Sequence, residues 1–158
     1  MIYQHEFRGK PYIVIDEGMP NYRWAMESFT LEKELRHEWW NIQEGDVVID
    51  AGAGYGSYTL PALASGAGLV IPIEPDKEVF FALCQNLLIN RTPPEKCLPL
   101  NCVLTDYGKR IMGYNTQYHS AVLNGGEKEE PRYSHTVDTL WEAYNFSRLD
   151  WLKIDVEG

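Results

Sequence analysis

The chain has 158 residues, 44% of them hydrophobic and 23% charged, and a net charge of −9. That length and composition predict an ordinary globular domain. The negative charge disfavours a nucleic acid or an anionic membrane surface as partner, because both bind clustered Lys and Arg side chains. No apolar run approaches the roughly 20 residues that cross a bilayer, the N-terminus does not resemble a signal peptide, and the three cysteines lack metal-ligand spacing. We therefore expect a cytoplasmic protein with reduced cysteines and no metal site.

The first segment, residues 1–41, predicts a small N-terminal unit. Residues 3–8 and 10–16 predict the two strands of a hairpin, and a helix is expected from Thr30 to Trp40. The main domain is expected to occupy residues 42–158.

The main domain opens with a predicted buried strand that runs into a glycine-rich turn. Val47-Val48-Ile49 is a continuous apolar run, as in strands of parallel sheets. The residues expected to form the cofactor turn are Asp50, Gly52, Ala53, Gly54, Tyr55 and Gly56. Glycines let the backbone come close to a ligand.

A second predicted strand, Leu69 to Ile73, ends at an acidic residue, Glu74, about 20 positions after the first turn glycine. A carboxylate in that place can accept hydrogen bonds from two ribose hydroxyls. Pro75 follows and is expected to shape the adenine pocket. Pro72 interrupts the strand, and because proline cannot donate to a ladder we expect it near the strand end.

The turn favours S-adenosylmethionine over a dinucleotide. Ser57 stands where the dinucleotide fingerprint has its third glycine, and no Lys or Arg lies between Asp46 and Glu74. Asp50 would repel a pyrophosphate but suits the ammonium group of an amino-acid tail. An NAD-binding oxidoreductase domain is the alternative.

Further elements continue the alternation of strands and helices. They are helices at about 56–65, from Asp76 to about Asn90 and at about 138–145, and strands at about 98–104 and 150–155. This alternation predicts a Rossmann-like α/β fold, a parallel sheet of order 3-2-1-4 with helices on both faces. Asn124-Gly125 predicts a hairpin turn between residues 118–123 and 133–136. Lys153 is expected to reach out to the sheet edge.

Three segments resemble motifs of a known family. Residues 49–59 look like motif I of class I S-adenosylmethionine-dependent methyltransferases. Residues 149–158, Leu-Asp-Trp-Leu-Lys-Ile-Asp-Val-Glu-Gly, resemble the signature of the FkbM-type methyltransferases, and residues 137–140 resemble its short upstream element. The resemblance covers roughly residues 42–158, and Gly54 departs from it because the family usually has Asn there.

The resemblance implies the cofactor S-adenosylmethionine and O-methylation of a small-molecule or sugar hydroxyl. It implies that Asp155 is an active-site residue, with Glu157 beside it. Either could hold the methionine amino group, orient the acceptor hydroxyl or act as base. It also places Thr105 and Asp106 at the adenine amino group.

A class I methyltransferase normally has seven strands, and this sequence supplies the first four. We therefore expect a truncated chain, for which a non-catalytic S-adenosylmethionine-binding module is a further alternative. The exposed edge of the fourth strand also keeps a homo-oligomer among the expected partners.

Overall fold

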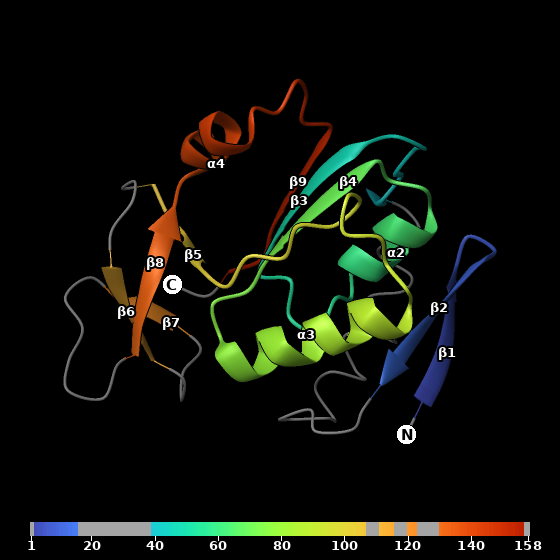
Figure 1. Ribbon diagram of the computed structural model, residues 1–158, viewed down its shortest axis with the longest axis horizontal. Helices are drawn as coiled ribbons and strands as arrows, with labels where there is room; N and C mark the ends of the chain where they lie inside the picture. Colours follow the sequence, from blue (N-terminus) through green and yellow to red (C-terminus); the bar gives the residue numbers. More distant parts are fainter. Residues whose placement is uncertain (1, 16–38, 107–110, 116–119, 123–129, 157–158) are drawn as a thin grey trace.

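The computed structural model describes residues 2–15, 39–106, 111–115, 120–122 and 130–156. A parallel sheet lies at its centre, with the N-terminal hairpin on one side and a second sheet on the other (Figure 1). The helix predicted from Thr30 to Trp40 lies almost entirely outside the described residues.

The central sheet has the predicted order. Strand β3 (Val47–Ala51) lies between β4 (Leu69–Ile73) and β9 (Trp151–Ile154), and both pairings are parallel. Residues 97–100 run beside β4 in the third place, joined to it by two isolated parallel bridges. The Rossmann-like α/β fold and the order 3-2-1-4 are therefore confirmed, although the third strand is only partly formed.

Pro72 explains why the third strand is incomplete. Pro72 lies near the end of β4, as expected, but pairing continues there: it pairs with Asp50, and its carbonyl accepts a hydrogen bond from Leu100 N at 2.9 Å. In a parallel ladder the N–H of the same residue would donate to the same neighbour, and proline has no N–H. One hydrogen bond between β4 and residues 97–100 is therefore missing, and only the two isolated bridges remain.

Two of the helices start at side-chain caps. Asp76 accepts hydrogen bonds from the backbone N–H groups of Glu78 and Val79 at the start of α3 (Lys77–Ile89), as predicted. Thr136 and Thr139 form a capping box at the start of α4 (Val137–Tyr144). Helix α2 (Thr59–Ala64) is shorter than the expected 56–65, because the glycine turn extends to its first residue.

Apolar side chains cover both faces of the sheet. One cluster gathers side chains from β3, β4, α2, α3 and the hairpin around Val48, Val70 and Leu83. The other gathers Ile49, Ile71 and Leu140 of α4 on the opposite face. Because successive strand residues point to opposite faces, Val48 and Ile49 belong to different clusters.

The N-terminal hairpin forms as predicted. Strand β1 (Ile2–Phe7) pairs antiparallel with β2 (Lys10–Ile15). Phe7, Tyr12 and Val14 are buried in the cluster that α2 and α3 share. The hairpin thus packs on the helices that follow the glycine turn and Glu74.

The second sheet was not predicted. It has the order β5 (Val103–Leu104), β8 (Glu130–His135), β6 (Ile111–Asn115) and β7 (Ser120–Val122). The predicted strand 98–104 is therefore divided, since its last residues pair with β8. The predicted hairpin between residues 118–123 and 133–136 was wrong, because β7 and β8 both pair with β6.

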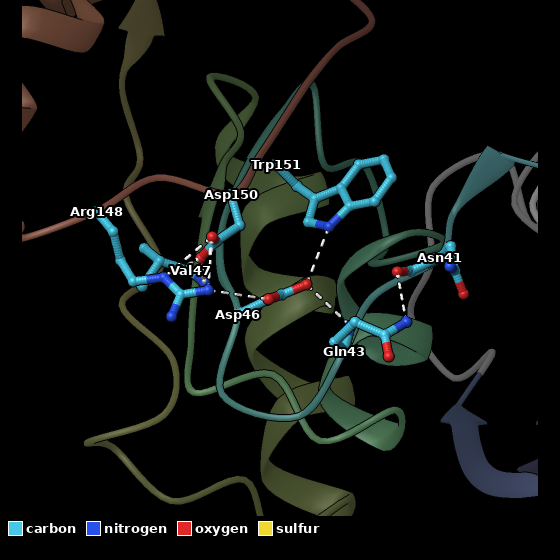
Figure 2. Close-up of polar contacts among 7 residues, drawn as sticks. All are labelled: Asn41, Gln43, Asp46, Val47, Arg148, Asp150 and Trp151. Atoms are coloured by element: carbon cyan, nitrogen blue, oxygen red, sulfur yellow. Dashed lines mark hydrogen bonds and ion pairs between the residues drawn. The ribbon is translucent and has the colours of Figure 1, made fainter.

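Charged side chains join β3 and β9 at their amino ends (Figure 2). Arg148 binds Asp150 at 2.6 Å and Asp46 at 3.3 Å, and Asp46 also accepts a hydrogen bond from Trp151 Nε1 at 3.0 Å. Asp150 in turn accepts from the backbone N–H of Val47 at 2.8 Å. We call Asp46, Arg148, Asp150 and Trp151 the amino-end cluster.

The described residues contain neither a membrane-spanning helix nor a metal-binding cluster. No helix there has the length and apolar character of a membrane span. No three His, Cys, Asp or Glu side chains there lie together as a metal site would need.

Candidate cofactor site

The glycine turn at the end of β3 lies directly against the last residues of β9. Gly52 has φ +74°, and a Cβ atom on it would stand 1.8 Å from the carbonyl oxygen of Asp155. Asp155 N donates to the carbonyl of Ala51 at 3.0 Å, which fixes this approach. Only glycine fits here, because it combines a positive φ with the absence of a side chain. The turn and the C-terminal motif, about a hundred residues apart, therefore meet at one edge of the sheet.

Glu74 holds the turn from the end of β4. Its Oε2 accepts a hydrogen bond from Gly54 N and its Oε1 one from Asp76 N, both at 2.9 Å. Each carboxylate oxygen has a second lone pair, so two acceptor positions remain for a diol. Burial raises the pKa of Glu74 to about 7, with smaller contributions from Asp76 and Asp50, against the lowering effect of the two backbone N–H groups.

Asp50 and Lys153 form a buried ion pair beneath the turn. Asp50 is fully buried; its Oδ2 accepts from Thr59 Oγ1 at 2.6 Å, and its Oδ1 lies 3.1 Å from Lys153 Nζ. Lys153 also donates to the carbonyl of Gly52 at 2.7 Å and lies over the ring of Tyr58. The prediction that Lys153 reaches out to the sheet edge was wrong: strand register places it opposite Asp50, and its side chain is only 12% exposed.

Tyr55 is tied to helix α3. Its side chain is buried, and its carbonyl accepts a hydrogen bond from Asn86 Nδ2 at 3.0 Å. Burial, with the negative charges of Asp76, Glu74 and Glu78, raises the pKa of Tyr55 to about 12. The phenol therefore stays neutral at physiological pH.

The predicted adenine-binding residues follow strands of two different sheets: Pro75 follows β4, and Thr105 and Asp106 follow β5. Asn101 Nδ2 donates to the carbonyls of Glu74 and Pro75, at 2.7 and 3.1 Å, and so fixes the backbone after β4. No local sequence pattern predicted a role for this asparagine. Thr105 N donates to the carbonyl of His135 at 2.9 Å, so Thr105 and Asp106 follow a strand that pairs with β8.

The structure describes only one of the two predicted catalytic carboxylates. The Asp155 side chain is 69% exposed and lies 3.8 Å from Lys153 Nζ. Its exposure leaves it accessible to a ligand above the turn. Glu157 lies outside the described residues.

The residues present fit S-adenosylmethionine. The turn has no side chain where a Cβ would strike Asp155, and Glu74 offers acceptors at the distance along the chain that a ribose-binding carboxylate has. A parallel sheet, a glycine turn after its first strand and an acidic residue after its second define a nucleoside-binding Rossmann-like site.

Comparison with known proteins identifies the family. The family described as Methyltransferase FkbM domain matches residues 50–158, and the chain belongs to it. The predicted family is thus confirmed, and with it the cofactor S-adenosylmethionine. No curated protein matches the chain.

Several solved structures are similar. TYW2 from M. jannaschii, solved in complex with AdoMet, is 21% identical, with 68% of this chain and 52% of that chain covered and a TM-score of 0.44. A tRNA methyltransferase from M. jannaschii is 19% identical, with 68% and 34% covered and a TM-score of 0.39. Trm5b from Pyrococcus abyssi is 19% identical, with 68% and 33% covered and a TM-score of 0.39. The chain therefore spans about half the length of these proteins or less, and a likeness of this extent carries no argument about its acceptor.

Proposed function

We propose that the protein is an S-adenosylmethionine-dependent methyltransferase that methylates a hydroxyl group of a small molecule or sugar. The observation that carries this proposal is the contact between Gly52 and Asp155. It joins the cofactor turn to the motif of the FkbM family that ends β9. The acceptor would then approach above the turn, at the exposed carboxylate of Asp155.

Each part of the site has a proposed role in holding the cofactor. The backbone of Gly52, Ala53, Gly54, Tyr55 and Gly56 would line it. Glu74 would bind the ribose hydroxyls, and Pro75, Thr105 and Asp106 would line the adenine. The sequence suggested that Asp50 meets the ammonium group of the cofactor. Because Asp50 is fully buried against Thr59 and Lys153, we propose instead that it supports the turn from below.

The catalytic step would need little from the protein beyond alignment and a base. The cofactor supplies a methyl group bonded to a positively charged sulfur. Asp155, or Glu157 beside it, would orient the acceptor hydroxyl and take its proton as the new C–O bond forms and the C–S bond breaks. The products are the methyl ether and S-adenosylhomocysteine.

The acceptor class is proposed from charge. A net charge of −9 opposes a phosphate backbone, whereas a neutral alcohol meets no such repulsion. We likewise propose that the protein works in the cytoplasm, and that a homo-oligomer would use the edge of β9, which pairs with β3 on one side.

Calorimetric titration with S-adenosylhomocysteine tests the site, with NAD titrated in parallel. We expect saturable binding of S-adenosylhomocysteine that Glu74→Ala abolishes, and no binding of NAD. Binding of NAD alone would overturn the proposal.

Transfer of labelled methyl groups tests the activity. We expect incorporation into sugars or small alcohols and none into RNA. Asp155→Asn should keep S-adenosylhomocysteine binding and lose turnover. Incorporation into RNA would contradict the acceptor class, and a wild-type protein that binds the cofactor but transfers to no acceptor would be a binding module.

A further inference from the structure

Helix α3 and its C-cap residue, Asn90, offer two asparagines to the outer edge of the N-terminal hairpin. Asn90 Oδ1 accepts a hydrogen bond from Ile13 N at 2.8 Å, and Asn90 Nδ2 donates to Ile13 O at 2.6 Å. One helical turn earlier, Asn86 Oδ1 accepts from Ile15 N at 2.8 Å. Strand β2 pairs with β1 on its other edge.

The spacing of helix and strand explains why two asparagines fit. Residues i and i+4 of a helix are about 6 Å apart along its axis, and residues i and i+2 of a strand about 6.7 Å. A carboxamide carries both a donor and an acceptor, as a backbone peptide does. Asn86 and Asn90 therefore take the place of a neighbouring strand at the edge of β2.

The two asparagines differ in their remaining hydrogen bonds. Asn86 is fully buried, and its Nδ2 donates to the carbonyl of Tyr55 in the glycine turn at 3.0 Å. Asn90 Nδ2 donates its other hydrogen bond within α3, to the carbonyl of Asn86 at 2.7 Å. Asn86 thus joins the hairpin to the glycine turn directly, whereas Asn90 joins the hairpin only to the helix.

We propose that Asn86 couples docking of the N-terminal hairpin to binding of the cofactor, as a positioning residue for the glycine turn. The hairpin precedes the residues that match the FkbM family, 50–158, so the family match gives it no role. The proposal rests on S-adenosylmethionine binding at the turn.

The physical reason lies in the burial of the amide. A buried polar group that loses one partner pays the cost of desolvation, so both hydrogen bonds of Asn86 favour the same arrangement. When the hairpin holds Asn86 through Ile15, the amide holds Tyr55 O and fixes the peptide that leads into Gly56. Such coupling is reciprocal: if docking strengthens cofactor binding, the cofactor must strengthen docking by the same factor.

Two matched variants, Asn86→Ala and Asn90→Ala, test the proposal. Each removes a side-chain amide from the same helix and frees one position of β2. We expect both to lower the melting temperature. The dissociation constant of S-adenosylhomocysteine should rise about tenfold or more for Asn86→Ala, as for loss of a buried hydrogen bond, and less than about threefold for Asn90→Ala. Equal dissociation constants for two folded variants would overturn the coupling.

Hydrogen exchange on the wild-type protein tests the reciprocal effect, and it applies even if Asn86→Ala does not fold. Saturating S-adenosylhomocysteine should slow exchange at the amides of Ile13 and Ile15, which are not among the proposed cofactor-binding residues. Protection confined to the turn and β4 would overturn the coupling while leaving the proposed function intact. A wild-type protein that does not bind S-adenosylhomocysteine would overturn both.

Discussion

Charged side chains link β3 to β9 at the amino ends of the two strands and again at their carboxyl ends. The two links differ in their exposure to solvent and in the backbone groups that they bind. At the amino end, the side chain of Arg148 is 57% exposed and that of Asp150 23%. At the carboxyl end, Lys153 is 12% exposed and Asp50 is not exposed at all. The amino-end cluster sets the position of two strands, whereas the buried pair also binds the carbonyl of Gly52 in the glycine turn.

This difference predicts unequal consequences of breaking the two links. An exposed ion pair contributes little to stability, because water and salt screen it. A buried pair costs desolvation energy, and it is kept where its geometry has a use. The buried link lies under the cofactor turn, and the exposed link lies at the opposite end of the same strands.

The largest expected effect comes from Gly52→Ala. A side chain there would require a positive φ and would strike the carbonyl of Asp155, so we expect a loss of about 4 kcal/mol in the free energy of unfolding. Denaturant unfolding measures this loss. Gly45→Ala is the matched control, because Gly45 precedes β3 with φ +85° but has no atom within 4 Å of the added Cβ. It should cost only ~1–2 kcal/mol. Equal costs would mean that strain alone, and not contact with β9, governs Gly52.

A smaller effect is expected from Lys153→Met, which leaves Asp50 buried without its cation. We expect a loss of about 3 kcal/mol in the free energy of unfolding. The double variant Asp50→Asn/Lys153→Met removes both charges and should recover most of it. If the double variant is no more stable than Lys153→Met, the ion pair is not the source of the effect.

Arg148→Met is the matched control at the amino end. It removes the cation of the exposed link, where Asp150 binds Arg148 and has its pKa lowered by that contact. The melting temperature should change less than in Lys153→Met, and the change should shrink in high salt because the pair is exposed. S-adenosylhomocysteine affinity should remain unchanged for Arg148→Met and fall for Lys153→Met. Equal losses of affinity would remove the distinction between the two ends.

A further effect is the pH dependence of Glu74. Its pKa is raised to about 7 in the folded protein, so the folded state binds a proton more tightly than the unfolded chain. The stability contribution of the protonated carboxyl is therefore complete below the unfolded pKa, near 4.5, and is lost as the pH rises through about 7. Ribose hydroxyls should prefer the ionised carboxylate, so S-adenosylhomocysteine affinity should fall by at most about tenfold per pH unit below about 7.

Titrations with S-adenosylhomocysteine at several pH values measure the trend in affinity, and unfolding curves at the same pH values measure the trend in stability. Glu74→Gln should flatten them, because the amide does not titrate. A pH dependence that survives in Glu74→Gln would have to come from another group.

Local sequence patterns were sufficient for the elements whose signals lie within a few residues. Asp76 caps α3 because its side chain reaches backbone N–H groups two and three residues later. The run Val47-Val48-Ile49 formed a buried strand, and the hairpin of residues 2–15 formed around its Arg8-Gly9 turn. The roles of the predicted site residues stay predictions, although Gly52 and Asp155 do meet.

Patterns failed where the outcome depends on a partner distant in sequence. Pro72 indicated that its strand would lack one backbone hydrogen bond. Which neighbouring strand lost that bond depended on the side of β4 that residues 97–100 would occupy. The turn signal at Asn124-Gly125 was valid only if β7 and β8 were neighbours, and β6 lies between them. Lys153 looked like an exposed strand lysine until the register placed it opposite Asp50.

The α/β alternation, the glycine turn with Glu74 after it, and the FkbM-type motif could be predicted from the sequence, because each depends on residues close together in the chain. Three features became visible only in the folded chain: Lys153 is buried under the turn, Asn101 fixes the backbone after Glu74, and Asn86 joins the hairpin to Tyr55. These residues carry no local signal, since a lysine or an asparagine suits many surface positions equally well. Their partners lie at least 26 residues away along the chain, and strand register and helix packing bring them within hydrogen-bonding distance.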